Sequence, residues 1–291
     1  MDEVTLLIFG CGYLGRRVAR RFLDSGVKVA AVTRSAERAR QLSDVGVVPY
    51  VADVADARTL ADLPAASFVL FAVGFDRAAG RTMSDVYQTG LANVLGRAAP
   101  QRRLVYISTT GVHSGESGEW IDEESPCEPA SEGAKNHWAA EQLLAAHGLA
   151  DRAVVLRMAG LYGPGRIPRR DELVAGKIVS GSAEGFLNLI HVDDAAAVVE
   201  AAAGHEQPSR AYVVSDGHPV RRWEYLAEIA RLLGAPPPRF DERQPATRRG
   251  PGNKRVNNAR MQAELLVELA YPTYRDGLAA IVAGEGFSHD A

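Results

Sequence analysis

The segment GCGYLG at residues 10–15 constrains the fold of this chain more than any other feature of the sequence. It follows an apolar run at 4–9 and precedes a helical pattern at 16–26, and its three glycines have G-x-G-x-x-G spacing. In a strand–turn–helix context this spacing is typical of a dinucleotide-binding loop, whose free N–H groups at the helix N-terminus bind phosphates. Gly10 is expected to make the tight turn, Gly12 to let the pyrophosphate approach the backbone, and Gly15 to let the helix pack on the strand. We expect such a loop, rather than a merely structural turn, from Gly10, Cys11, Gly12, Tyr13, Leu14 and Gly15.

Short apolar runs alternate with helical patterns over the first half of the chain. The apolar runs lie at 4–9, 27–33, 47–54, 67–74, 102–109 and 152–158, and the helical patterns lie at 16–26, 35–46, 84–99 and 130–148. Continuous apolar strands separated by helices indicate a parallel sheet that is buried on both faces. Because crossovers between parallel strands are right-handed, we predict an α/β fold with a doubly wound parallel Rossmann sheet.

The alternation loosens after residue 158, where a loop rich in Gly, Pro and Arg begins. A strand running into a helix follows at 187–203, then a strand at 211–216, a helix at 221–234 and a long loop at 235–255. A chain of 291 residues is long for one compact domain, so one main core with a small appended lobe is the economical expectation. We predict an NAD(P)-binding Rossmann domain at 1–158 plus 186–214, and a small C-terminal substrate lobe at 159–185 and 215–291.

Composition excludes several classes of function. The formal net charge of −3 gives no basic field for nucleic acid or anionic lipid, and no apolar window of about 20 residues predicts a membrane span. The two cysteines, Cys11 and Cys127, form neither a disulfide framework nor a cysteine-based metal site, and Cys11 is interpreted as a small loop residue. The acidic N-terminus, MDEV, is unlike a signal peptide. These features predict a cytoplasmic protein with no metal, nucleic-acid or membrane partner.

The end of the second predicted strand indicates which nicotinamide cofactor the loop would bind. It reads Thr33, Arg34, Ser35, with no acidic residue to bind the ribose 2′-hydroxyl of NAD. Arg34 can pair with a 2′-phosphate, and no carboxylate neighbours it in the sequence. The predicted cofactor is therefore NADP, with NAD as the alternative. Asp53, after the third strand, is either an acceptor for the adenine amino group or a loop cap.

These residues, with STTGV (108–112), LRMAGLYGPGR (156–166) and IHVDDAA (190–196), resemble the extended short-chain dehydrogenase/reductase superfamily, NAD-dependent epimerase/dehydratase type. The order and spacing agree from residue 4 to the end, and GCGYLG resembles the atypical members that lack the usual active site. The resemblance implies that Asp53 and Val54 flank the adenine and that Ser108, Thr109 and Thr110 lie near the substrate oxygen. It also implies nucleotide contacts by Arg34, Ser35, Ala72, Val73 and Gly74, and structural roles for His191, Asp193 and Asp194.

The sequence departs from this superfamily at its catalytic pair. Members carry a Tyr and a Lys four residues apart on the helix after the fifth strand, where the lysine charge lowers the tyrosine pKa for proton transfer. Counting back from Glu141 puts Gly133 in the place of the tyrosine and His137 in the place of the lysine. Lys135 is two residues from His137 and is expected to face another side of the helix. No tyrosine lies between residues 106 and 162, so no shift of the alignment restores the pair.

Two interpretations of function remain open from the sequence. In the first, the chain is an NADP-dependent oxidoreductase or epimerase that acts on a carbonyl or sugar-nucleotide-like substrate with another proton donor. The candidate donors are Ser108, Thr109, His113 and His137, although each histidine is more readily interpreted as a polar residue near the pocket. In the second, the chain is a catalytically silent NADP-binding sensor or regulatory protein. A pocket filled by Trp138 or Phe186 would favour the second interpretation.

The expected partner is a small-molecule substrate. Arginines in the loops at 159–171 and 239–255 indicate either an anionic substrate or a solvated surface. These are Arg166, Arg169, Arg170, Arg239, Arg248, Arg249 and Arg255. The resemblance implies a homodimer as one possibility, because members often pair two helices of each copy.

Overall fold

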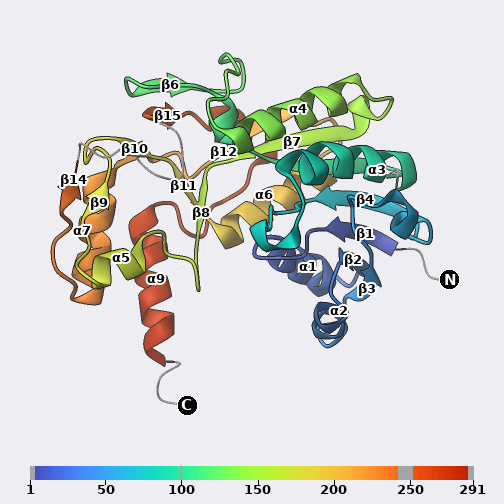
Figure 1. The fold of residues 1–291 in the computed structure, drawn as a ribbon, viewed down its shortest axis with the longest axis horizontal. Coiled ribbons are helices and arrows are strands. Elements are labelled where there is room, and N and C mark those ends of the chain that lie inside the picture. The colour runs from blue at the N-terminus through green and yellow to red at the C-terminus, as the bar shows by residue number, and fades with distance from the viewer. Residues whose placement is uncertain (1–3, 99, 242–251, 288–291) are drawn as a thin grey trace.

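The computed structural model of the protein describes residues 4–98, 100–241 and 252–287, with side chains described as far as Gly284. A parallel sheet covered by helices on both faces forms the larger part, and a smaller lobe lies beside it (Figure 1). The predicted α/β doubly wound Rossmann fold is thus confirmed. The domain boundaries drawn from the sequence stay a prediction.

The central sheet has seven parallel strands in the order β12-β7-β5-β4-β1-β2-β3. The chain starts in the middle with β1, adds β2 and β3 on one side, and then crosses to β4 on the other side. Ligands of doubly wound folds bind outside the carboxyl ends of the strands at this reversal. The strands are β1 (Val4–Phe9), β2 (Val29–Thr33), β3 (Val48–Val51), β4 (Ala66–Phe71), β5 (Arg103–Thr109), β7 (Ala153–Met158) and β12 (Ala211–Val214).

Alternate residues of β1 show why both faces of the sheet are covered. Leu6 and Ile8 pack in one apolar cluster with residues of α1 (Gly15–Asp24) and α6 (Val192–Gly204). Leu7 and Phe9 pack in a second cluster with residues of α3 and α4. Since successive side chains of a strand point to opposite faces, a strand apolar at every position needs helices on both sides. The remaining helices of this unit are α2 (Ala36–Ser43), α3 (Gly90–Arg97), which a π-helical turn at Asp85–Thr89 precedes, and α4 (Glu132–Ala146).

The smaller lobe has its own apolar core. Tyr162, Leu173, Leu226 and Leu278 are almost fully buried in one cluster that joins the lobe's helices and short strands. Its strands pair as β8 with β11, β9 with β14 and β10 with β13. The elements are β8 (Gly160–Tyr162), α5 (Arg170–Val174), β9 (Val179–Ser180), β10 (Phe186–Leu187), β11 (Leu189–His191), β13 (Val220–Arg221), α7 (Arg222–Leu233), β14 (Phe240–Asp241) and α9 (Tyr274–Phe287).

The chain returns to the larger unit between α7 and α9. β15 (Lys254–Val256) pairs with β6 (Glu119–Ile121), and α8 (Ala259–Leu265) contributes Met261 to the cluster shared by α1 and α6. Single 3-10 turns lie at Ala57–Leu60, Arg77–Ala79, Thr110–Val112 and Ala150–Arg152.

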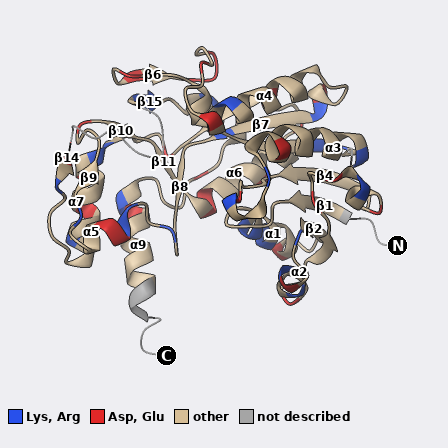
Figure 2. Ribbon diagram, viewed as in Figure 1, with Lys and Arg blue, Asp and Glu red and all other residues tan. Residues whose placement is uncertain are grey.

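Acidic and basic residues are interspersed over both parts of the molecule (Figure 2). Within the described ranges, no helix is long and apolar enough to cross a membrane.

Candidate nucleotide-binding and active site

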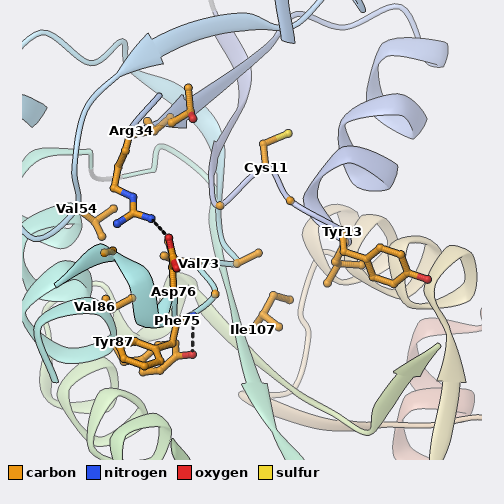
Figure 3. A pocket seen from close by; sticks show the side chains of 18 of the residues that line it. Cys11, Tyr13, Arg34, Val54, Val73, Phe75, Asp76, Val86, Tyr87 and Ile107 are labelled. Atoms are coloured by element: carbon orange, nitrogen blue, oxygen red, sulfur yellow. Dashed lines mark hydrogen bonds and ion pairs between the residues drawn. The ribbon is translucent and has the colours of Figure 1, made fainter. Parts of the chain in front are cut away.

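A cavity of about 650 Å³ lies at the carboxyl ends of the central strands, where the strand order reverses. Segments far apart in the sequence meet around it, from the glycine loop after β1 to the N-terminal part of α4. Most residues predicted to bind a nucleotide or to do chemistry share this one cavity (Figure 3). They are Gly10, Cys11, Gly12, Tyr13, Leu14, Thr33, Arg34, Asp53, Val54, Ala72, Val73, Gly74, Ser108, Thr109 and His137.

The three glycines of the loop differ in the room around them: Gly10 and Gly15 are tightly packed, and Gly12 has open space beside it. Gly10 has a φ of +92°, and a Cβ there would collide with the Ala72 carbonyl group. A Cβ on Gly15 would lie 2.5 Å from the Gly10 carbonyl oxygen, so the absence of a side chain here lets α1 start against the loop. A Cβ on Gly12, by contrast, would have no other atom within 4 Å, although Gly12 lines the cavity. The open space beside the Gly12 backbone fits the pyrophosphate of a dinucleotide.

The first two side chains of the loop, Cys11 and Tyr13, pack against other parts of the protein. Burial raises the pKa of the Cys11 thiol to about 11, so Cys11 packs as a small apolar residue and does not ionise at neutral pH. The Tyr13 ring lies on the opposite side of the loop and has the guanidinium of Arg166 5.4 Å from its centre. Arg166 comes from the loop after β8 and also lines the cavity.

The end of the cavity that is predicted to hold the adenosine differs from the prediction in one respect. The sequence places no carboxylate beside Arg34, but an Arg34 nitrogen lies 2.9 Å from an Asp76 carboxylate oxygen (Figure 3). Asp76 comes from the loop after β4, 42 positions further along the chain, so inspection of the second strand alone could not identify it. Arg38, one turn further along α2, also lines the cavity and was not predicted. Its spacing of four from Arg34 was the available signal.

Ser35 and Asp53 both have local structural roles. The Ser35 hydroxyl accepts a hydrogen bond from the Arg38 backbone N–H and caps α2, and Ser35 does not line the cavity. One Asp53 carboxylate oxygen accepts from the Ala55 N–H at 2.9 Å, and the other pairs with Arg81 at 3.1 Å. Asp53 is therefore a loop cap that also lines the cavity, and its role as an acceptor for the adenine amino group stays a prediction.

A buried row of polar groups runs behind the far wall of the cavity. The Ser108 hydroxyl donates to a Glu141 carboxylate oxygen at 2.5 Å, and the other Glu141 oxygen pairs with Arg157 at 2.8 Å. All three side chains are buried. Because the hydrogen of Ser108 is used by Glu141, its oxygen can only accept a hydrogen bond from a ligand. The Thr109 hydroxyl accepts from the Gly111 N–H and keeps its own hydrogen for donation.

His113 is not at the cavity, which corrects its prediction as a proton donor. Its ring is 2% exposed and contacts Arg157 through Nε2 at 3.1 Å and the Ser125 carbonyl through Nδ1 at 3.1 Å. Burial, and then the Arg157 guanidinium, lower the pKa of His113 to about 4. The reason is the turn at Thr110–Val112, after which the chain leaves the sheet and the side chain faces Arg157.

His137 does line the cavity, in the place expected from the sequence. Its Nδ1 lies 2.9 Å from the Tyr106 hydroxyl, and its ring packs against the tilted ring of Tyr87 with a centroid distance of 4.2 Å. Burial lowers the pKa of His137 to about 4, so the ring is neutral at pH 7. Lys135 is exposed on another face of α4. Tyr87, which the sequence did not single out, lines the cavity from the π-helical turn before α3.

The residues of the IHVDDAA segment have the structural roles expected for them. His191 accepts from the Asp193 N–H through Nδ1 at the start of α6, and Asp194 accepts from the N–H groups of Ala270 and Tyr271.

Of the arginines considered as anion-binding residues, Arg166 alone belongs to the described lining of the cavity. Arg169 pairs with Glu172, Arg239 and Arg255 donate to backbone carbonyls, and Arg170 is engaged as well. Arg248 and Arg249 lie outside the described residues.

Known proteins resemble the chain over most of its length. It is 32% identical over 209 residues to the 3-diazoavenalumate denitrifying reductase of a Streptomyces species, which covers 62% of this chain and 66% of that relative. The aligned part is thus just under two-thirds of that relative's length. It is 29% identical to Protein YeeZ of Escherichia coli, over 91% of this chain and 95% of the relative.

The chain is also similar to a solved structure of an NAD-dependent epimerase/dehydratase family protein from Methylobacillus flagellatus. It is 31% identical, has a TM-score of 0.77, and the match covers 98% of this chain and 100% of that one. The model of the NAD dependent epimerase/dehydratase family matches residues 6–232, which span both the glycine loop and the far wall of the cavity. The chain belongs to the NAD-dependent epimerase/dehydratase family, within the extended short-chain dehydrogenase/reductase superfamily.

Proposed function

We propose that this chain is an NADP(H)-dependent oxidoreductase that reduces a carbonyl group of a small substrate. The observation that supports this most strongly is the continuity of one cavity from Arg34 and Arg38 past Gly12 to Ser108 and His137. A nucleotide and a reacting group therefore have room in the same space. When bound, the reduced nicotinamide supplies a hydride, and the residues of this chain position the carbonyl and its oxygen.

NADP is preferred over NAD in this proposal because two arginines flank the first turn of α2. Arg34 precedes the helix and Arg38 lies within it, so both guanidinium groups reinforce the positive end of the helix dipole. A ribose 2′-phosphate would gain charge-assisted hydrogen bonds there. Asp76 opposes this effect by pairing with Arg34, whereas the ion pairs of the described residues do not include Arg38. Arg38 is thus the more available partner.

The reductase is favoured over a cofactor-binding regulator because neither of the two aromatic side chains considered from the sequence fills the cavity. Neither Trp138 nor Phe186 belongs to its described lining. Trp138 lies beside Arg157, and Phe186 stacks with Arg221 at 4.1 Å in the smaller lobe. The end of the cavity at Ser108, Thr109 and His137 is instead bordered by polar groups that can position a substrate oxygen.

Titration calorimetry with NADPH and NADH, followed by an assay of NADPH consumption, tests the proposal. We expect NADPH to bind more tightly than NADH. We expect Arg38→Ala to weaken NADPH binding by at least about 10-fold, or about 1.4 kcal/mol, and Arg34→Ala to weaken it less. The substrate panel contains an aliphatic ketone, an aromatic aldehyde and a 3-oxoacyl ester. Failure to bind either nucleotide would overturn the proposal, and binding without consumption of NADPH for any carbonyl would favour the regulatory protein.

A further inference from the structure

The hydroxyl group of Tyr106 determines which nitrogen of His137 carries the hydrogen. Tyr106 lies in β5 and is 0% exposed, so its O–H needs an acceptor inside the protein. The acceptor in the described part of the chain is His137 Nδ1, at 2.9 Å. With hydrogen on Nδ1 instead, the hydroxyl hydrogen of Tyr106 would be left buried without a partner, which costs about 1–3 kcal/mol. His137 therefore accepts through Nδ1 and carries its hydrogen on Nε2.

The ring of His137 is held in place by a second tyrosine. Tyr87 packs against it, with the two rings tilted by 39° and their centroids 4.2 Å apart, and the Tyr87 hydroxyl accepts a hydrogen bond from the Phe75 N–H at 3.2 Å (Figure 3). Tyr87 belongs to the π-helical turn, a rare form of helix that is frequent at functional sites. Nδ1 faces the protein core, so the ring edge with Nε2 remains for the cavity that His137 lines.

We propose that the Nε2–H group of His137 donates a hydrogen bond to the oxygen of the carbonyl that accepts the hydride, and that Tyr106 is a positioning residue that fixes this tautomer. The inference rests on the proposed function. As the hydride adds to the carbonyl carbon, the π electrons of the C=O bond become a lone pair on oxygen. The His137 N–H stabilises that negative oxygen, which then takes a proton from water.

Among the polar groups at this end of the cavity, the His137 N–H and the Thr109 hydroxyl have a hydrogen to donate, and the Ser108 hydroxyl does not. Ser108 cannot donate to the substrate, because its hydrogen is bound to Glu141, whose carboxylate Arg157 holds in place. A neutral imidazole is the suitable donor, since it requires no fixed cation and keeps one N–H at every pH above its own titration. Burial lowers the pKa of His137 to about 4, which is consistent with this neutral form.

Long-range ¹H–¹⁵N correlation spectra of the ¹⁵N-labelled protein at pH 7 test the tautomer without cofactor or substrate. The signal missing from His137→Gln assigns the ring. We expect a protonated Nε2 and an unprotonated Nδ1 in the natural protein, and a mixture of tautomers in Tyr106→Phe. Tyr212→Phe is the matched control, because Tyr212 is equally buried but its hydroxyl donates to Glu264. A proton on Nδ1 in the natural protein would overturn the inference, even where the Tyr106 variant does not fold.

Turnover of whichever panel carbonyl the natural protein reduces tests the catalytic part. We expect His137→Leu to lower kcat about 10²–10³-fold, the usual cost of losing one donor to a developing oxyanion. His137→Gln, which keeps an N–H donor, should retain most of that activity, and Tyr106→Phe should lower kcat with little change in KM or in NADPH affinity. Undiminished kcat in His137→Leu would overturn the inference and leave the proposed function intact. An inactive natural protein would instead refute the proposed function, while the tautomer stays measurable.

Discussion

At the scale of single residues, the buried pair of Glu141 and Arg157 organises the far wall of the cavity. The carboxylate accepts from Ser108 on one side and binds the guanidinium on the other, and both charged side chains are under 10% exposed. Burying two charges is costly, and the loss of one partner leaves the other unpaired in a poor solvent for charge. The pair therefore fixes the direction of the Ser108 hydroxyl rather than adding much net stability.

We predict that Arg157→Ala destabilises the protein by about 3–5 kcal/mol, because Glu141 would remain buried without its partner. Urea unfolding at pH 7 measures this free energy. Arg20→Ala is the control, since the Arg20–Asp24 pair is largely exposed and should contribute less than about 0.5 kcal/mol. A loss below about 1 kcal/mol for Arg157→Ala would show that the pair is well solvated.

A second prediction concerns Asp216, whose Oδ2 is buried without a hydrogen-bond partner among the described residues. Burial raises its pKa to about 7, above the ordinary 3.8 of the unfolded chain. The folded protein thus binds more protons than the unfolded chain between pH 4 and 7, and this group's stabilising contribution is lost as pH rises through that range. The slope is at most about 1.4 kcal/mol per pH unit.

Asp216→Asn should remove that dependence and keep the acceptor for the His218 N–H. The difference in unfolding free energy between the variant and the natural protein should therefore grow in favour of the variant from pH 4.5 to pH 7. Asp151→Asn, at a side chain that is 92% exposed, should show no such trend. Equal differences at both pH values would contradict the assignment.

At the scale of elements, the glycine loop contains one glycine that is expected to affect nucleotide binding and another that is expected to affect stability. Gly12 has open space beside it, and Gly15 is pressed against the Gly10 carbonyl oxygen. We predict that Gly12→Ala weakens NADPH binding by at least about 10-fold and changes the unfolding free energy by less than about 0.5 kcal/mol. Gly15→Ala should destabilise the protein by about 1–3 kcal/mol, because backbone atoms must move. Calorimetric titration and urea unfolding of both variants check this, and equal effects of the two variants would refute it.

Elements with an apolar run or a helical periodicity of their own were predictable from the sequence, and the isolated strands β6 and β15 were not. β1 spans residues 4–9 as predicted, and α4 spans 132–146 against a predicted 130–148, since Ser131 caps the helix. Runs of apolar residues with strand or helix periodicity carry their own signal. β6 and β15 have three residues each and pair across more than 130 positions, so only their partners stabilise them. No local pattern indicates such strands.

The candidate site divides in the same way. The order of glycines, strand ends and the helix after the fifth strand predicted which segments meet at the cavity, because parallel strands place their carboxyl ends together. The sequence could not show which side chains pair across it. Arg34 with Asp76, and His113 with Arg157, are contacts between residues more than 40 positions apart. Tyr87 was missed because it lies in a helix that carries no recognised catalytic pattern.

At the scale of the whole molecule, two ion pairs tie the loop after β4 to the opposite rim of the cavity. Asp76 pairs with Arg34, and Arg81 pairs with Asp53, so the rim around the adenosine end joins three strand ends. Both pairs are partly exposed, so each contributes little to stability. Their larger effect is on the charge at the rim of the cavity, because each pair neutralises a side chain that a bound nucleotide would contact. The homodimer expected from the sequence stays a prediction.

We predict that Asp76→Asn raises NADPH affinity about 3- to 10-fold and NADH affinity less, because Arg34 then loses its carboxylate partner but keeps its charge. The asparagine oxygen can still accept from the Ala78 N–H, so the turn is preserved. Calorimetric titration measures both affinities. Asp56→Asn is the control, since Asp56 pairs with Arg58 and does not line the cavity. Lower NADPH affinity in Asp76→Asn would show that Asp76 itself binds the nucleotide.

Hydride transfer itself tests the central claim most directly. The natural protein and Gly12→Ala would be incubated with NADPH carrying deuterium at C4, in each of its two configurations, and with each carbonyl of the panel. At an NADPH concentration near the Kd of the natural protein, the account predicts an alcohol product one mass unit heavier from one configuration only, and less of it from the variant, because the variant binds NADPH more weakly. Tight binding of NADPH without deuterium in any product would contradict the reductase and favour a protein that binds the nucleotide without using it.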